Sequence, residues 1–530
     1  MNKRDLYHLT RQVDFLWKST LVLAVVFVLL GMGIGSLNTG RLDSYQRIVS
    51  VPRYVDEFTE ELDGDYTRPA HNTAVADAVR DMLASPAPFH EKLENIRFLL
   101  YFAAPDDRVS VPVATELPNL SGKEHAVASA FVAAASGEKN EAALVALAGG
   151  DAPVAHANYA LALLRESRQE NSKSIAALKR EIEFHNSDPA RRRLVNTYLD
   201  AKQFNELEKL ISDPEYKPFI SSFVLREVAL SRMDWPALVK AHFRSAYEGT
   251  NLAMAVLALL SGLVWATILF RFNGSLSVLK LAVPALLLGA LSTHATLLFI
   301  YWQEYQLGFT MGQETVGQIV YCILGIGLRE EAMKLLLFVP LIPFLLKRTD
   351  LEILTIAGLV GLGFAIEENI NYFESTAGVS ALGRFATANF LHIALTAMCG
   401  LTLTRAVAHR GEEIQHALTT FVSAVAIHGL YDAFIMVPAV EDYSFLSSTV
   451  FVLMAYQYFG WLRHLREEWR DPVSITSVFT LGVLLVTGIS FCLYAWKAGP
   501  YPALQAIGYE AIGVGIILIL FYREIPETLE

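Results

Sequence analysis

The 530-residue sequence contains only three cysteines, and Cys322, Cys399 and Cys492 all lie in apolar segments. The polar stretch 38–245 has none, so it holds no disulfide framework. Neither Cys-x-x-Cys nor His-Glu-x-x-His occurs, which excludes the two commonest zinc signatures. Charged residues make up only 18% of the chain, and the formal net charge of −11 argues against nucleic acid as a partner.

Apolar residues are abundant instead. They make up 53% of the chain, the mean hydropathy is +0.35, and apolar runs of about 20 residues recur. Ordinary soluble domains lack such runs, so the sequence predicts an all-α, polytopic helical membrane protein with about ten spans in contact with membrane lipid. After a first span that ends near residue 37, the others are expected near 250–271, 278–301, 316–346, 351–373, 385–408, 415–438, 446–464, 474–496 and 502–522.

The first span is predicted to be an uncleaved signal anchor. The first 18 residues carry Lys3, Arg4, Arg11 and Lys18, and residues 19–37 are almost wholly apolar. This run is longer than the apolar part of a typical signal peptide, and no small-x-small cleavage site follows it. Residues 1–37 are therefore interpreted as a cytoplasmic N-terminus with its span.

Residues 38–245 contain no spanning segment and are predicted to form a helical domain. Pro153, the Asp188-Pro189 step and the Asp213-Pro214 step mark helix boundaries within the stretch 154–245. The short helices resemble a tetratricopeptide-type array of hairpins, but no full repeat consensus appears, so a plain helical bundle is an equal alternative. For 40–120 the sequence predicts no fold.

The loop charges predict the topology. With the basic N-terminus in the cytoplasm, the outward loops carry acids and the inward loops carry bases, as the positive-inside rule requires, with Lys497 as the one clear exception. The outward acids are Glu304, Glu374, Glu441 and Asp442. The inward bases are Arg271, Lys280, Lys347, Arg348, Arg405, Arg410, Arg463, Arg466 and Arg470. Both termini are then cytoplasmic, and the domain 38–245 is extracytoplasmic.

Acid/base groups occur inside four consecutive predicted spans. Glu330 and Glu331 lie within 316–346, where two adjacent carboxylates are costly and call for a function. A charged loop that splits this segment is the structural alternative. The three following spans contain Phe364-x3-Glu368-Asn369, His392 and His428-x3-Asp432.

These polar groups are predicted to meet at one depth. Glu330 is sixteen residues from Leu346 at the cytoplasmic end, so it lies roughly 24 Å up in a slab about 30 Å thick. Glu368, His392 and His428 are also expected in the outer half. Residues 316–438 are therefore predicted to be the catalytic core, between accessory spans in 246–315 and C-terminal spans in 439–530.

The cluster contains the groups that hydrolysis needs. Residues four apart share a helix face, as Glu330 does with Lys334 and His428 with Asp432. A pair of carboxylates in a low dielectric with a lysine beside it can keep one acid neutral and one charged. An ionised glutamate could take a proton from water, and a histidine could stabilise the oxyanion. Gly358, Gly361 and Gly363 predict close helix packing beside the site.

At these residues the chain resembles the PrsW family of intramembrane proteases, which are related to the CAAX prenyl endopeptidases and their bacterial relatives. The matching motifs are Glu330-Glu331-x-x-Lys334, Phe364-x-x-x-Glu368-Asn369, His392-x-x-x-Thr396-x-x-x-Gly400 and His428-Gly429-x-x-Asp432. The motifs occur in order on consecutive spans, and they cover roughly residues 316–438.

The resemblance implies hydrolysis of membrane-anchored protein substrates near the extracytoplasmic face of a bacterial cytoplasmic membrane, with anti-sigma factors as one substrate class. It makes Glu330, Glu331 and His428 the leading catalytic residues. Glu368, His392 and Asp432 complete the predicted site, and Lys334, Phe364 and Asn369 support it. Spacing does not decide which glutamate activates water. The domain 38–245 is expected to select substrates, to bind a protein partner or to act as a structural cap.

Two other functions stay open. No cofactor is expected for a glutamate protease, but a zinc-dependent membrane hydrolase could use nitrogen and oxygen ligands from Glu368, His392, His428 and Asp432. A proton-coupled transporter or a receptor without enzymatic activity could also contain intramembrane acids and histidines. The chain lacks evident inverted-repeat halves with paired broken helices, which argues against the transporter.

Overall fold

A computed structural model describes residues 3–37, 79–101, 120–135, 141–273, 278–465 and 473–525. Every regular element in these ranges is a helix, as the all-α prediction requires. The chain divides into two compact units, one formed by residues 1–41 and 249–530 and the other by 42–248. Of the segments considered above, Arg466, Arg470 and most of 40–120 lie outside the described ranges.

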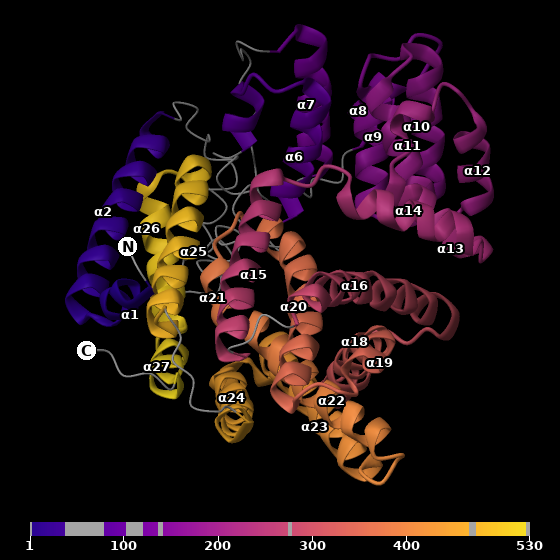
Figure 1. The fold of residues 1–530 in the computed structure, drawn as a ribbon. Helices are drawn as coiled ribbons and strands as arrows, with labels where there is room; N and C mark the ends of the chain where they lie inside the picture. Colours follow the sequence, from indigo (N-terminus) through magenta and orange to yellow (C-terminus); the bar gives the residue numbers. More distant parts are fainter. Residues whose placement is uncertain are drawn as a thin grey trace. The chain divides into compact units, whose positions relative to one another are not determined.

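The unit 42–248 is built from short helices that pack mainly on their neighbours in the chain (Figure 1). Such sequential packing is typical of an array of helical hairpins. Its helices are α6 (Phe89–Tyr101), α7 (Gly122–Ala135), α8 (Ala142–Ala148), α9 (Ala157–Ser167), α10 (Asn171–His185), α11 (Asp188–Asp200), α12 (Phe204–Ser212), η1 (Lys217–Phe219), α13 (Ser222–Arg232) and α14 (Trp235–Tyr247).

A partly buried carboxylate links three helices of this unit. Glu166 in α9 accepts a hydrogen bond from Arg97 of α6 at 3.0 Å, and it pairs with Arg193 of α11. Burial alone would raise the pKa of the Glu166 carboxyl, but the hydrogen bond and charge of Arg193 hold this pKa below its ordinary value. The charge therefore stays on Glu166 and fixes α6, α9 and α11 to one another.

The other unit is the membrane part. Eight of its described helices are long and apolar enough to cross a bilayer, or nine if the bent pair α26 and α27 forms one span. The protein is therefore a multi-pass membrane protein. The helices are α1 (Lys3–Arg11), α2 (Val13–Leu37), α15 (Leu252–Asn273), α16 (Leu279–Leu307), α17 (Thr315–Val320), η2 (Tyr321–Gly327), α18 (Leu328–Phe338), η3 (Val339–Leu341), α19 (Ile342–Leu345), α20 (Asp350–Ser375), α21 (Ala381–Ala386), α22 (Ala388–Ala408), α23 (Ile414–Met436), η4 (Pro438–Tyr443), α24 (Phe445–Leu465), α25 (Ile475–Ala498), α26 (Pro500–Gly513) and α27 (Gly515–Glu524).

Two predicted spans are less regular than expected. The segment 316–346 is helical from Thr315 to Leu345, but it contains the π-helical turn η2 and the 3₁₀ turn η3, and Pro340 lies in η3. The predicted span 502–522 bends by 52° between α26 and α27. The segment 316–346, broken by these turns, is not among the eight or nine described helices that could cross a bilayer, against about ten predicted spans. Apolar content does not report the local turns at which the helix changes direction.

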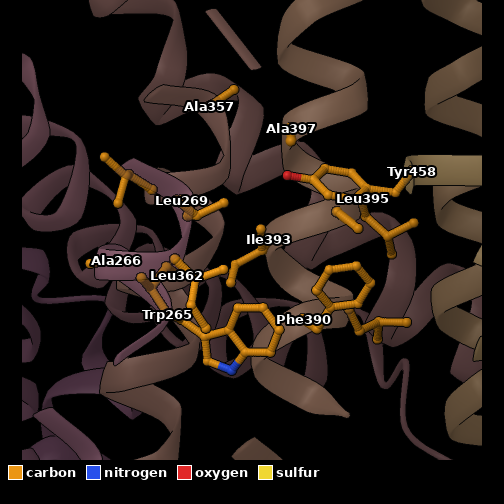
Figure 2. Close-up of a cluster of buried hydrophobic side chains, with 14 of the residues drawn as sticks. Trp265, Ala266, Leu269, Ala357, Leu362, Phe390, Ile393, Leu395, Ala397 and Tyr458 are labelled. Carbon is orange, nitrogen blue, oxygen red and sulfur yellow. The ribbon is translucent and has the colours of Figure 1, made fainter. Parts of the chain in front are cut away.

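Helices α20 and α22 form the centre of the membrane unit. Nearly every side chain from Ile353 to Ala365 and from Ala388 to Thr402 is buried, so these helices have no lipid-facing side there. Beside them, Trp265 of α15 packs on Phe385 and Phe390 and donates its indole N–H to the Phe385 carbonyl at 2.8 Å (Figure 2). The active-site candidates on α20 and α22 are therefore held by a rigid apolar core.

Glycines let the central helices approach closely. A Cβ at Gly361 would lie 2.1 Å from the His392 carbonyl oxygen on α22, and one at Gly363 would lie 2.1 Å from the Leu286 carbonyl oxygen on α16. Both distances are far below van der Waals contact, so the helices fit together only because these positions lack side chains. The close approach predicted for this stretch is confirmed.

We predict that Gly361→Ala destabilises the membrane unit by about 1–3 kcal/mol, because α22 must move away from α20 to accept the methyl group. The thermal unfolding midpoint of the purified protein measures the effect. Gly460→Ala on α24 is the matched control, since nothing lies within 4 Å of a Cβ there. An unfolding midpoint lowered equally by both substitutions would show that the close approach has no special importance.

Candidate active site

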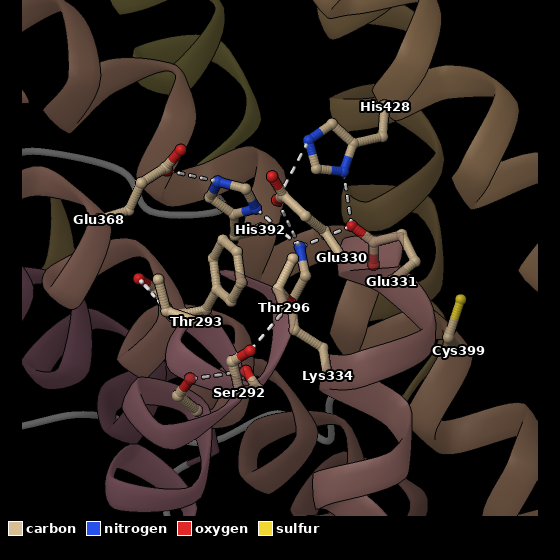
Figure 3. Close-up of polar contacts among 12 residues, drawn as sticks. Ser292, Thr293, Thr296, Glu330, Glu331, Lys334, Glu368, His392, Cys399 and His428 are labelled. Carbon is tan, nitrogen blue, oxygen red and sulfur yellow. Dashed lines mark hydrogen bonds and ion pairs between the residues drawn. The ribbon is translucent and has the colours of Figure 1, made fainter. Parts of the chain in front are cut away.

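Four helical segments bring the predicted polar residues into one cluster (Figure 3). Glu330, Glu331 and Lys334 lie on α18, directly after the π-helical turn η2. The other groups come from α20, α22 and α23. Both glutamates are within a helix, so the alternative of a charged interhelical loop is wrong.

Lys334 lies at the middle of the cluster, and its side chain is 0% exposed. Its ammonium group donates to Glu331 Oε1 at 2.7 Å and contacts His392 Nδ1 at 2.9 Å. It also lies 3.7 Å from Glu330 Oε2 and 4.3 Å from the centre of the Phe364 ring. A buried ammonium needs such compensation, so these contacts hold α18 against α20 and α22.

The contact with Lys334 fixes the protonation of His392. An ammonium group only donates hydrogen bonds, so Nδ1 of His392 must accept and Nε2 must carry the hydrogen. Nε2 then donates to Glu368 Oε2 at 3.1 Å. Glu368 also receives a hydrogen bond from Arg384 at 2.5 Å. Both ring nitrogens of His392 are therefore engaged.

Glu331 is the more constrained of the two adjacent acids. Its Oε1 accepts from Lys334 and lies 2.7 Å from Nδ1 of His428, and its side chain is 1% exposed. Oε2 of Glu331 has no hydrogen-bond partner among the described residues. Glu331 thus connects α18 to α23 and orients the His428 ring.

Glu330 makes no hydrogen bond to the described residues. Its Oε2 lies 3.6 Å from Nε2 of His428, and its side chain is 12% exposed. Asp432 Oδ2 lies 3.5 Å from the same ring nitrogen. These separations exceed good hydrogen-bond lengths, so Glu330 and Asp432 approach the ring nitrogen without forming a hydrogen bond to it.

The supporting residues lie around this centre. The Phe364 ring is 5.0 Å from the His392 ring, so it covers the Lys334 and His392 contact on the side of α20. Asn369 is displaced from the centre, where it accepts from Arg384 and donates to Asn389 at 2.6 Å. All nine predicted residues therefore belong to one cluster, although Asn369 acts through Arg384 and Asn389.

Arg384 is a site residue that the motifs did not reveal. It lies on the short helix α21, pairs with Glu368 and stacks on Tyr372 with its guanidinium carbon 3.7 Å from the ring centre. A signal was present in the sequence, because Arg384 is the only Lys, Arg, Asp or Glu between residues 375 and 404. A lone charge beside an apolar span needs a partner, and Glu368 is that partner.

The fold and the cluster bring acids and imidazoles together beside a buried lysine inside a membrane protein. Residues 277–459 match the model of the PrsW family of intramembrane metalloproteases. Over this segment the chain is similar to the PrsW family, and the match supports a membrane protease. No curated protein and no solved structure matches the chain.

The description of this family names a metal, so the fit of the site to a metal ion matters. Donor atoms of Glu330, His392 and His428 lie within 4.8 Å of one another. The two histidines of this set were predicted as zinc ligands. The third donor is Glu330, in place of the predicted Glu368 and Asp432. However, both nitrogens of His392 already have partners, and the Lys334 ammonium is 2.9 Å from one of them. The arrangement therefore does not fit a divalent cation unless Lys334 moves away.

We predict that Arg384→Gln lowers kcat about 10- to 100-fold with little change in KM, because Glu368 loses its cation and no longer fixes His392. Arg384→Lys should recover part of kcat, since it restores the charge. The measurement is steady-state cleavage of a membrane-anchored substrate.

Arg405→Gln is the matched control, because Arg405 pairs with Asp350 at the cytoplasmic end predicted for these helices. A loss of similar size in Arg405→Gln, or the absence of any recovery in Arg384→Lys, would remove the positioning role of Arg384.

Proposed function

We propose that the protein hydrolyses peptide bonds of membrane-anchored proteins and that Glu330 activates the attacking water. One observation carries this assignment: Glu331 is engaged by Lys334 and His428, whereas Glu330 makes no hydrogen bond to the described residues and is the more exposed acid. A general base needs a free carboxylate that water can reach. The choice between the two glutamates, which their spacing left open, therefore falls on Glu330.

In the proposed reaction the Glu330 carboxylate takes a proton from water while the water oxygen attacks the scissile carbonyl carbon. The resulting oxyanion is stabilised by an N–H of His428 at Nε2, the nitrogen that faces Glu330 and Asp432. Glu330 then gives the proton to the amide nitrogen, and the carbon–nitrogen bond breaks. Asp432 favours the protonated ring that this donation requires.

The remaining charges keep this arrangement in place. Lys334 compensates the two glutamates, and His392 orients Lys334 through its unprotonated nitrogen. Glu368 and Arg384 in turn hold the ring of His392. None of these groups needs to change its protonation during the reaction, so they act as a fixed electrostatic environment.

The proposed substrates are single-span proteins that are cut near the outer face of a bacterial cytoplasmic membrane. The loop charges support this orientation, because they favour cytoplasmic termini and an extracytoplasmic unit 42–248. Membrane-anchored anti-sigma factors are the substrate class that the family resemblance implies. The helical unit is proposed to select substrates, since hairpin arrays offer concave binding surfaces.

A metal-dependent hydrolase is the second candidate, because the donors of Glu330, His392 and His428 lie close together. Zinc accepts such nitrogen and oxygen ligands, and it would supply a Lewis acid and a more acidic bound water. Lys334 would then have to leave His392.

We predict that Glu330→Gln lowers kcat by roughly 10²–10⁴-fold, the usual contribution of a general base, while the protein remains folded. Glu331→Gln should lower both kcat and the thermal unfolding midpoint, because Lys334 and His428 lose their shared acceptor. Glu374→Gln, an exposed position at the end of α20, is the control and should behave like the parent. Full activity in Glu330→Gln would disprove the assignment.

Chelation separates the two candidates. We predict that the purified protein keeps its activity after dialysis against 1,10-phenanthroline, because the Lys334 ammonium already compensates the glutamates. Cleavage of one substrate before and after dialysis is the measurement, with a known zinc protease treated in parallel. Loss of activity that added zinc restores would favour the metal-dependent mechanism instead.

A further inference from the structure

A second charged group lies beside the catalytic pair but outside the cluster. Arg329 precedes Glu330 on α18, and it is only 3% exposed. Its guanidinium carbon lies 5.0 Å from the centre of the Phe309 ring and 5.4 Å from that of Tyr321. Phe309 belongs to the irregular loop between α16 and α17. Lipid-exposed irregular chain does not occur within the hydrocarbon, so this guanidinium is near the headgroup level.

The bonding of Arg329 is incomplete. Nη1 donates to the Tyr321 hydroxyl at 3.5 Å, and that hydroxyl donates to Glu304 Oε1 at 3.0 Å. Nε and Nη2 are buried and have no hydrogen-bond partner among the described residues. Glu304 is therefore reached only through a hydroxyl, and one edge of the guanidinium makes no hydrogen bond to the described residues.

The edge formed by Nε and Nη2 of Arg329 suits a particular kind of ligand. Nε and Nη2 point their hydrogens in parallel, which is the geometry that binds two oxygens of a phosphate or a carboxylate. A buried charge that lacks such a partner is strongly destabilising, so an anion belongs here. Two aromatic rings beside the guanidinium keep its plane in place.

We propose that Arg329 binds the phosphate of a phospholipid through this edge. The exposed side chains on the same helical run are apolar, namely Val320, Leu324 and Leu328, and they offer a surface for the acyl chains. Among the described residues no hydrogen bond or ion pair joins the Arg329 side chain to the proposed catalytic groups, so the site is separate from that cluster. Binding of the headgroup requires the Phe309 ring to turn aside, and this ring is carried by a loop that contains Gly308 and Gly312. Basic pockets between membrane helices bind phosphate headgroups in this way.

The test measures lipid binding to the purified full-length protein by native mass spectrometry. The probes are phosphatidylglycerol and a diacylglycerol with the same acyl chains, which lacks the phosphate. Arg329→Gln should weaken phosphatidylglycerol binding about tenfold, the contribution expected of hydrogen bonds to a charged group. Diacylglycerol binding should not change.

Two further variants make the result interpretable. Arg329→Lys keeps the charge but cannot bind two oxygens side by side, so it should lose most of the same affinity even if Arg329→Gln fails to fold. Arg348→Gln is the control, because Arg348 lies in an exposed position beyond α19 and pairs with Glu352. It should bind like the parent.

Equal phosphatidylglycerol binding by the parent and Arg329→Lys would overturn the proposal. Arg329→Lys could instead raise KM only for substrates with an acidic residue beside their span. The Nε and Nη2 edge would then bind a substrate carboxylate, and the lipid proposal would again be wrong. Native mass spectrometry measures lipid binding without any catalytic step, so the lipid-binding results do not depend on the proposed role of Glu330.

Discussion

The buried ammonium group of Lys334 is the constraint on which the membrane unit depends. A positive charge with no exposure to water must be compensated inside the protein. Glu331 and His392 supply this compensation directly, and Glu330 lies close by. Both acids lie on α18 with Lys334, whereas His392 accepts its hydrogen bond from α22, so this contact favours the arrangement of α18 and α22 in which Lys334 faces His392.

From this centre a continuous set of contacts extends in two directions. On one side His392 leads to Glu368 and Arg384, and on the other Glu331 leads to His428. Within this set the Glu331 carboxylate makes short hydrogen bonds, whereas Glu330 approaches Lys334 and His428 only at 3.7 and 3.6 Å. Two adjacent and identical side chains thus have different surroundings, which supports the different roles proposed for them.

Much of this arrangement could be predicted from the sequence. Apolar runs located most spans, and helical spacing with depth placed Glu330, Glu368, His392 and His428 in one pocket. The π-helical turn before Glu330 and the bend after Gly513 were not predictable in this way, because both depend on local backbone geometry that composition does not report. Arg384 was missed because it lies in a connection between spans, where a charge is ordinarily solvated. The difference between Glu330 and Glu331 follows from tertiary contacts alone.

The charged network also has a consequence for assembly of the helices. Lipid is as apolar as leucine, so burial of hydrocarbon barely discriminates between a correct helix pair and one displaced by a turn. Displacement of α18 along α22 by one turn, about 5.4 Å, would separate Lys334 from His392 and leave two buried polar groups without their hydrogen bond, although Lys334 would keep its acids on α18. The groups proposed to carry out hydrolysis therefore also favour one register of the bundle.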